Sequence, residues 1–95
     1  MLLLVHSTAE AVTFEWDPHE DETVIGFMLY KSKVSGQYTY GQENAVAIIP
    51  NGTHQAIIED PGSYYWVVTA YNDDGESLPS NEVVFGLTKR TVIIY

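Results

Sequence analysis

The stretch that decides the fold spans residues 60–71 and reads Asp60-Pro61-Gly62-Ser63-Tyr64-Tyr65-Trp66-Val67-Val68-Thr69-Ala70-Tyr71. It opens with a turn, because Pro61 presets φ and Gly62 tolerates a positive φ. Aromatic and β-branched residues, which suit a pleated and packed surface, follow almost without a break. Strand alternation gives one face with Tyr64, Trp66, Val68 and Ala70, and another with Tyr65, Val67, Thr69 and Tyr71. Both faces are apolar enough to be covered, so the pattern predicts a central strand.

The rest of the chain shows short strand patterns between turn signals, and no window has a helical period. The predicted strands cover residues 2–6, 11–16, 24–31, 38–40, 45–49, 55–58 and 82–85. Asn51-Gly52 is a strong tight-turn dipeptide between two of them. Strands at this spacing predict an all-β, two-sheet sandwich with almost no helix. Alternation also selects the expected core residues: Val12, Phe14, Trp16, Phe27, Leu29, Tyr64, Trp66 and Val68.

Composition narrows the classes of partner. The chain has 95 residues, enough for one domain, and it contains no cysteine, so neither a disulfide nor a cysteine-based zinc site is expected. Its 13 acidic and 4 basic residues give a formal net charge of −9. This charge disfavours binding to nucleic acid or to an anionic membrane. It favours solubility, or docking onto a basic protein partner.

Both ends of the chain are apolar. The first run, Leu2-Leu3-Leu4-Val5, follows no basic residue and ends at His6, which is too short for a signal peptide or a membrane span. The last run, Val92-Ile93-Ile94-Tyr95, would be an aggregation hazard if it were free. We therefore expect it to pair, either with its own sheet or with another chain. The expected division is a sandwich over residues 1–86, with its body at 11–85, and an extension over 87–95. Residues 2–5 fall outside that body and are expected to form an apolar N-terminal extension.

Five motifs in order resemble a fibronectin type III domain, of the kind found in bacterial and bacteriophage proteins, over roughly residues 11–85. They are Val12-x-Phe14-x-Trp16-Asp17-Pro18, Ile25-Gly26-Phe27-x-Leu29, Pro61-Gly62-Ser63-Tyr64, Thr69-Ala70-Tyr71-Asn72-Asp73-Asp74-Gly75-Glu76-Ser77 and Pro79-Ser80-Asn81-Glu82-Val83. The resemblance implies an immunoglobulin-like sandwich of seven strands in two sheets. It also implies that Trp16 is the core tryptophan of strand B and Tyr64 the tyrosine of the corner before strand F. Alternation favours Tyr64 over Tyr65, because only Tyr64 shares a face with Trp66, which we expect to face Trp16 across the core.

The sequence contains only weak motifs for metal binding or for glycosylation. The acidic loop at residues 17–23 could offer oxygen ligands to calcium, but it lacks the spacing of an EF-hand, so a solvated loop is favoured. Its candidate ligands are Asp17, His19, Glu20, Asp21 and Glu22. The three histidines, His6, His19 and His54, have no metal-ligand spacing. Asn51-Gly52-Thr53 matches a glycosylation sequon, yet the same residues explain themselves as a hairpin turn.

Catalysis is not expected. The chain has no cysteine nucleophile, no Gly-x-Ser-x-Gly elbow and no glycine-rich phosphate loop. A filled sandwich of this size also leaves little room for a cleft. We therefore expect no enzyme activity, no catalytic or metal residues, no cofactor and no small-molecule substrate.

The tyrosines suggest protein contacts. Tyr30, Tyr38, Tyr40, Tyr65 and Tyr71 cannot all fit inside one small sandwich. They serve either as contact residues or as cross-strand pairs on an outward face, and the sequence leaves both readings open.

The leading functional hypothesis is a structural subunit that docks onto a larger, symmetric protein assembly through its apolar ends and this tyrosine face. A small virion component assembled in the host cytoplasm, such as a bacteriophage capsid or tail accessory protein, fits that description. The predicted contact residues are Leu2, Leu3, Leu4, Tyr30, Tyr65, Tyr71, Val92, Ile93, Ile94 and Tyr95. The alternative is a secreted or cell-surface module that recognises carbohydrate or a receptor through loops 17–23, 41–44 and 72–80. Those loops contain no aromatic residue for stacking on a sugar, which disfavours it.

Overall fold

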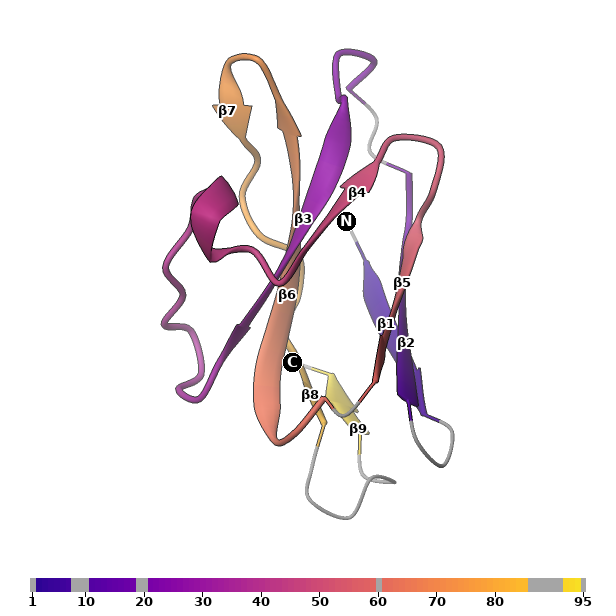
Figure 1. Ribbon diagram of the computed structural model, residues 1–95, viewed down its shortest axis with the longest axis vertical. Helices are drawn as coiled ribbons and strands as arrows, with labels where there is room; N and C mark the ends of the chain where they lie inside the picture. The colour runs from indigo at the N-terminus through magenta and orange to yellow at the C-terminus, as the bar shows by residue number, and fades with distance from the viewer. Residues whose placement is uncertain (1, 8–10, 19–20, 60, 86–91, 95) are drawn as a thin grey trace.

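The computed structural model describes residues 2–7, 11–18, 21–59, 61–85 and 92–94. Two antiparallel sheets lie face to face, so the expected all-β, sandwich-like fold is confirmed (Figure 1). In these ranges the helical content is a single short 3₁₀ turn, η1 (Gln42–Asn44). The structure therefore agrees with the absence of any helical period in the sequence.

The first sheet has three strands in the order β1-β2-β5. They are β1 (Leu3–Ser7), β2 (Ala11–Trp16) and β5 (Gln55–Glu59). The alternation read in β2 holds, because Val12, Phe14 and Trp16 are buried while Glu15 is exposed. This sheet thus turns one apolar face towards its partner sheet.

The second sheet is larger and runs in the order β4-β3-β6-β8-β9, with β7 also paired to β6. Its strands are β3 (Gly26–Ser32), β4 (Ala47–Pro50), β6 (Tyr64–Asn72), β7 (Gly75–Glu76), β8 (Val83–Phe85) and β9 (Val92–Ile94). The strand predicted within residues 60–71 is β6. It pairs with β3 from Gly26↔Tyr71 to Ser32↔Tyr65 and with β8 on its other side. Its predicted central position is confirmed.

The main core fills the space between the sheets and contains seven of the eight expected core residues as fully buried side chains. Tyr64 is half-buried and packs against this core from its rim. The ring of Trp66 stacks on Phe14 at 4.6 Å, while Trp16 meets Phe27 at 5.5 Å. Trp16 and Trp66 thus contribute to the same core from opposite sheets, and each indole makes its ring contact with a phenylalanine.

The N-terminal run is part of the sandwich and not an apolar extension. In β1, Leu3 pairs with Trp16 and Val5 with Phe14, and both leucine and valine are buried in the main core. The prediction that Leu3 is a contact residue is therefore wrong, because alternation turns it inward. Leu2 and Leu4 point outward and are 46% and 37% exposed.

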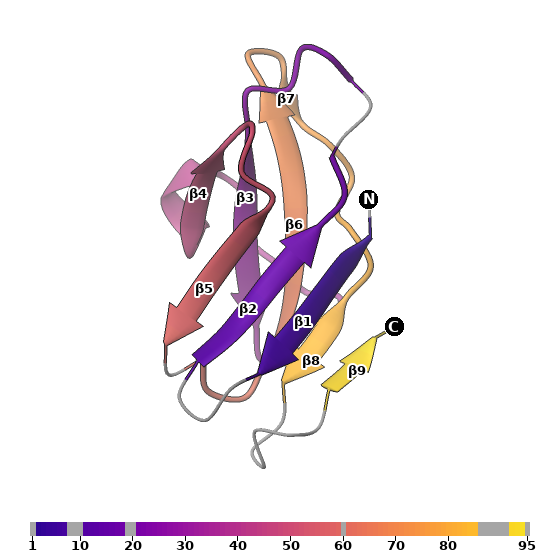
Figure 2. The same cartoon turned by 90° about the vertical axis from the view of Figure 1, so that its right-hand side faces the viewer.

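Asn81 fastens this edge of the sandwich. Its side chain accepts a hydrogen bond from the N–H of Leu3 (2.8 Å) and donates one to the carbonyl of Leu3 (3.1 Å). Figure 2 shows β1 beside the segment that leads into β8, where Asn81 lies. One amide side chain therefore satisfies the backbone at the edge of β1 and links the two sheets.

The C-terminal run pairs with its own sheet, one of the two outcomes that the sequence left open. β9 is antiparallel to β8, with Val83↔Ile94 and Phe85↔Val92 as partners. Tyr95, another predicted contact residue, lies outside the described residues. The described strands number nine and not seven, because β9 adds an edge strand and because β7 and β8 both flank β6.

The predicted strand at residues 38–40 is wrong. Residues 33–46 instead form a long connection between β3 and β4, which we call the cover, and η1 lies within it. Figure 1 shows the cover on the side of the second sheet that faces away from the first sheet.

Candidate interaction surface

The second sheet is buried on both of its faces. On β3, Phe27 and Leu29 point into the main core, while Met28 and Tyr30 point outward. The outward pair forms a second cluster with Val67 of β6, and all three side chains are at most 6% exposed. Tyr38 and Ala45 of the cover and Tyr71 of β6 pack against this cluster. The cover therefore closes a small second core over the outer face of the sheet.

Aromatic stacking contributes to this closure. The ring of Tyr40 meets Tyr30 edge-on at 5.1 Å, and Tyr38 lies 6.1 Å from Tyr40. Such pairs contribute about 0.5–1.5 kcal/mol beyond the area they bury. Residues 38–40 thus use their alternation to place two tyrosines on the sheet below, without joining the sheet as a strand.

Glu82 anchors the start of the cover. Its carboxylate accepts hydrogen bonds from the hydroxyl of Ser35, the N–H of Gly36 (2.8 Å) and the hydroxyl of Tyr38 (2.7 Å). Partial burial opposes the charged form, but the hydrogen bonds outweigh it, so the pKa of Glu82 is lowered. Burial, followed by the hydrogen bond to Glu82, raises the pKa of Tyr38. The ionised carboxylate and the neutral phenol therefore stabilise each other.

Glu76 makes the second anchor, on β7. One carboxylate oxygen accepts hydrogen bonds from the hydroxyls of Tyr30 and Thr69, each at 2.6 Å. The N–H of Gly41 donates to the oxygen of Tyr30 at 3.1 Å, which ties the cover to the same group. Burial, followed by the hydrogen bond to Glu76, raises the pKa of Tyr30 to about 12.

Tyr30 is consequently not an exposed contact residue, and that prediction is wrong. Its side chain is 1% exposed, its ring lies under Tyr40 and its hydroxyl is engaged by Glu76. Tyr65 and Tyr71, the other two tyrosines expected on this face, are half-buried. The tyrosine-bearing face is thus mostly occupied by the chain itself. The signal for this was present in the sequence, since β3 is apolar at outward positions that only a covering segment could bury.

Four exposed apolar side chains belong to the cover and to β4. They are Val34 (51% exposed), Tyr40 (41%), Val46 (40%) and Ile48 (43%), and we call them the apolar rim. Ile48 is opposite Met28 in the β3–β4 register, so its side chain lies on the outer face beside the second core. Single exposed hydrophobic residues are ordinary, but four in one short stretch mark a contact surface more strongly. Sequence reasoning named Tyr40 among the surplus tyrosines but missed Val34, Val46 and Ile48, because alternation alone cannot tell which outward residues a connection will cover.

The rim lies next to an open sheet edge. β4 is the end strand of the second sheet, and β3 is its one partner among the strands described. An end strand presents backbone N–H and C=O groups that another chain can pair with. Apolar side chains and available backbone groups therefore coincide at β4.

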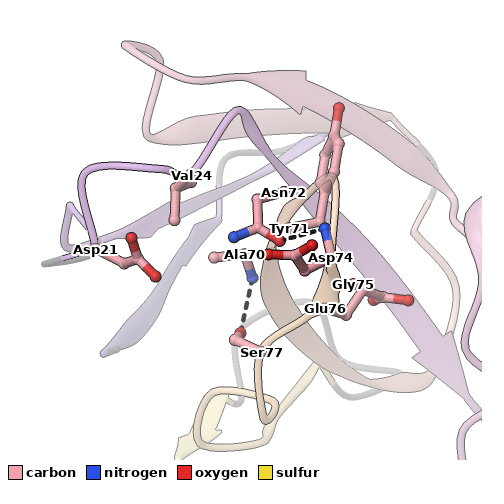
Figure 3. A pocket seen from close by; sticks show the side chains of 9 residues that line it. All are labelled: Asp21, Val24, Ala70, Tyr71, Asn72, Asp74, Gly75, Glu76 and Ser77. Carbon is pink, nitrogen blue, oxygen red and sulfur yellow. Dashed lines mark hydrogen bonds between the residues drawn. The ribbon is translucent and has the colours of Figure 1, made fainter.

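A shallow pocket of about 210 Å³ opens near the β6–β7 turn (Figure 3). It is lined by Asp21, Val24, Ala70, Tyr71, Asn72, Asp74, Gly75, Glu76 and Ser77. Figure 3 shows Asp21 on one side of the pocket, with Asn72 and Asp74 on the other. Internal hydrogen bonds occupy several of its polar groups, including Ala70 N–H to the Ser77 hydroxyl and Asp74 N–H to Asn72 Oδ1. We interpret the pocket as a surface hollow beside a turn that these hydrogen bonds stabilise.

The proposed calcium loop is incompletely described, because His19 and Glu20 lie outside the described residues. Within the described ranges, no group of three or more His, Asp or Glu side chains has an arrangement that could hold a metal ion. Asp21 accepts hydrogen bonds from the N–H and hydroxyl of Thr23, as in a capped turn.

His54 packs its ring on Phe27 at 5.4 Å. No helix in the described part is long and apolar enough to cross a membrane.

Basic charge gathers at the opposite end of the second sheet. The Lys31 amine lies 4.2 Å from the centre of the Tyr64 ring, and the Lys33 amine lies 5.9 Å from it. Tyr64 also packs edge-on against Trp66 at 6.4 Å. The ring of the expected corner tyrosine therefore bridges the main core and two of the chain's four basic residues.

Comparison with known proteins gives similarity at the level of structure. No family model matches the chain, and a search of curated proteins finds no match. Solved structures do match, among them one described as a myokine structure, with a TM-score of 0.60 and 25% sequence identity. The alignment covers 87% of this chain and 88% of that one. The similarity therefore extends over most of the length of both chains.

Proposed function

We propose that this chain is a fibronectin type III-like domain that acts as a non-enzymatic protein-interaction module. The strand order supports this identity. β7 and β8 flank the same side of β6, and the intervening N–H groups of Ser77 and Ser80 bond to the carbonyls of Ala70 and Val68. Counted as one interrupted strand, they give seven strands in two sheets, to which β9 is added. Seven strands in two antiparallel sheets are typical of immunoglobulin-like sandwiches.

The binding surface in this proposal is the apolar rim together with the edge of β4. The observation that carries it is the exposure of Val46 and Ile48 at an end strand. A partner segment can add a strand to β4 through backbone hydrogen bonds, while the two side chains provide apolar anchors. The net charge of −9 favours a partner with a basic surface and speeds its approach.

A photo-crosslinking residue placed at position 48 tests this surface in the source cells. The matched control is position 57, because Ile57 is 61% exposed on β5, the end strand of the other sheet. We expect a defined adduct from position 48 and little from position 57. A second variant, Ile48→Lys, should reduce the adduct formed from a crosslinker at position 46. Equal labelling from positions 48 and 57 would contradict the proposed surface.

The absence of catalysis is part of the same proposal. The pocket near the β6–β7 turn is a shallow hollow, and its carboxylates lie among backbone and amide groups that already bond to one another. Among the described residues that line it, the Ser77 hydroxyl accepts from the Ala70 N–H and donates to the Leu78 carbonyl, whereas covalent catalysis needs a nucleophile that bonds to a base. A hydrolytic activity that is lost on Asp74→Asn substitution would overturn this assignment.

The narrower form of the proposal places the module in a virion, as an accessory or decoration protein that docks onto a larger, basic shell. The acidic charge supports it. The N-terminal run no longer does, because Leu3 and Val5 are in the core. Mass spectrometry of purified particles tests this form, and the chain should be present in a fixed ratio to the main shell protein. Its absence from such particles would exclude the virion role.

A secreted recognition module is the second candidate, and the similarity to a myokine structure favours it. The two candidates differ in where the protein is found. Fractionation of the source culture distinguishes them, since this second role requires the chain to be outside the cell and free of particles. Loops 17–23, 41–44 and 72–80 would then be the first positions to substitute in a binding assay.

A further inference from the structure

The turn between β4 and β5 brings a backbone nitrogen against a side-chain amide. Asn51 and Gly52 are both exposed, and Gly52 has a φ of +101° with nothing within 4 Å of the position that a Cβ would take. The N–H of Gly52 donates to Oδ1 of Asn51 at 3.0 Å. The Asn51 side chain is thus folded back over the following peptide, and the carbon that carries Oδ1 lies close to the Gly52 nitrogen.

The backbone around this contact is held in place. The N–H of Asn51 donates to the carbonyl of Ile25 at 3.1 Å, and the N–H of Thr53 donates to the carbonyl of Pro50 at 3.3 Å. The bond from Thr53 to Pro50 closes a tight β-turn with Asn51 and Gly52 at its centre, in which glycine adopts the positive φ without strain. This turn connects two sheets and is not the hairpin that the sequence suggested, because β4 and β5 do not pair with each other. The folded state therefore keeps the Asn51 amide and the Gly52 nitrogen together at an exposed turn.

The other three asparagines differ from Asn51 in both sequence and contacts. Each is followed by a residue with a side chain, and each has its amide nitrogen bonded to the protein. The bonds join Asn44 Nδ2 to Tyr40 O (3.2 Å), Asn72 Nδ2 to Thr23 Oγ1 (2.7 Å) and Asn81 Nδ2 to Leu3 O (3.1 Å). These bonds hold the three amides away from ring closure. They provide an internal comparison within one molecule.

We propose that Asn51 is a site of spontaneous deamidation that proceeds in the folded protein through a cyclic imide. The Gly52 nitrogen gives its proton to hydroxide and bonds to Cγ of Asn51, and the bond from Cγ to Nδ2 breaks. The side-chain nitrogen leaves as ammonia and takes up a proton from water. Water then opens the imide. Attack at Cγ leaves aspartate at position 51, while attack at the main-chain carbonyl leaves isoaspartate.

Both products change the turn. Aspartate adds a negative charge to an already acidic chain. Isoaspartate also inserts a methylene into the main chain, at a tight turn whose hydrogen bond from Thr53 to Pro50 spans the altered residue. Since β4 and β5 belong to different sheets, the altered turn weakens the connection between them and loosens the end strand β4. The rate of deamidation at this turn therefore sets how long that edge of the sandwich keeps its original structure.

The test is ageing of the purified full-length chain in warm, mildly alkaline buffer, followed by peptide mapping with mass spectrometry. Electron-based fragmentation separates aspartate from isoaspartate. We expect Asn51 to lose its amide at least about tenfold faster than the other three asparagines, because the glycine after it leaves the ring-closing nitrogen unhindered. Hydrogen exchange of the aged fraction should rise in the β4 and β5 amides. The Asn51→Gln variant, which cannot readily close the five-membered ring, should stay unchanged in this region.

Three results would overturn the proposal. Loss of the amide at Asn51 no faster than at Asn44, the most exposed of the comparison residues, would remove the site. Loss at Asn51 only when the chain is unfolded in urea would show that the native turn protects it. Protein from its natural source that carries a glycan on Asn51 would lack the free amide that the reaction needs, since this residue also lies in a glycosylation sequon.

Discussion

The two faces of the second sheet are buried in different ways, and the difference concerns polarity. The inner face packs against β1, β2 and β5 through aliphatic and aromatic side chains. The outer face is closed by the cover, and the hydroxyls of Tyr30 on β3 and Tyr38 on the cover donate to the carboxylates of Glu76 and Glu82. Burial of the inner face relies on the hydrophobic effect, which is insensitive to pH. Closure of the outer face relies on hydrogen bonds to ionised carboxylates, and these depend on pH.

The two faces also differ in whether their buried polar atoms have hydrogen-bond partners. In the described part of the protein, the indole nitrogens of Trp16 and Trp66 are buried without a hydrogen-bond partner. An unsatisfied buried donor costs about 1–3 kcal/mol, which the inner core tolerates because each indole buries a large apolar area. On the outer face, the Tyr30 and Tyr38 hydroxyls both have carboxylate acceptors. The smaller cluster depends on polar groups that are fully satisfied.

The largest effect is expected from the inner core. Trp66→Ala removes a side chain that is 0% exposed and should destabilise the fold by about 3–5 kcal/mol. Denaturant unfolding followed by circular dichroism measures it. If Trp66→Ala lowered the free energy of unfolding by less than the outer-face variants do, the inner core would not be the more stabilising of the two.

A smaller and local effect is expected from Glu82→Ala. Three donors on the cover lose their acceptor, which should cost about 1–3 kcal/mol. Hydrogen exchange should rise over residues 33–46 and remain low in β2 and β6. Glu43→Ala is the matched control, because Glu43 lies on the same cover, is exposed and makes only a 3.5 Å contact to Asn44. Uniform exchange across the domain would show that the cover does not open separately.

Acid should produce a weaker form of the same opening. The folded-state pKa of Glu82 is below its ordinary value of 4.5, so its contribution to stability is fully present above pH 4.5. That contribution is lost as the pH falls through the lowered pKa. Because the protonated carboxyl keeps an acceptor oxygen, the loss should be smaller than in Glu82→Ala. Tyrosine fluorescence and exchange over residues 33–46, measured from neutral to acidic pH, test this. The Glu82→Ala protein should lack this component.

The smallest effect comes from a matched pair of hydroxyl deletions. Tyr38→Phe removes a hydrogen bond to a carboxylate and should cost about 1–2 kcal/mol. Tyr64→Phe keeps the ring contacts with Trp66 and Lys31 and should cost about 0.5 kcal/mol or less. Thermal unfolding of both variants measures the difference. A larger loss at Tyr64 would mean that its hydroxyl stabilises the corner before β6.

Alternation predicted most of the inner face correctly. It placed Val12, Phe14 and Trp16 inward, and it identified β6 as central. The prediction for Leu3 failed, since this residue of the predicted strand 2–6 was expected to be a contact residue and is 0% exposed. The length of an apolar run does not show which strand it will pair with. The prediction for Tyr30 also failed, because an outward position in a sheet is exposed only if no other segment lies over it.

The sequence by itself determined the all-β class, the positions of most strands and the inward residues, because these depend on the local period of the side chains. The tertiary structure alone decided which outward residues are covered. Residues 33–46 return over the second sheet, where Glu82 bonds directly to Gly36 and Tyr38 from more than 40 positions further along the chain. Glu76 is connected to Gly41 of the cover through the hydroxyl of Tyr30. Such contacts depend on closure of the whole sandwich, which no local pattern encodes. The β6 strand is therefore central in two respects, since it is buried by the main core on one face and by the cover on the other.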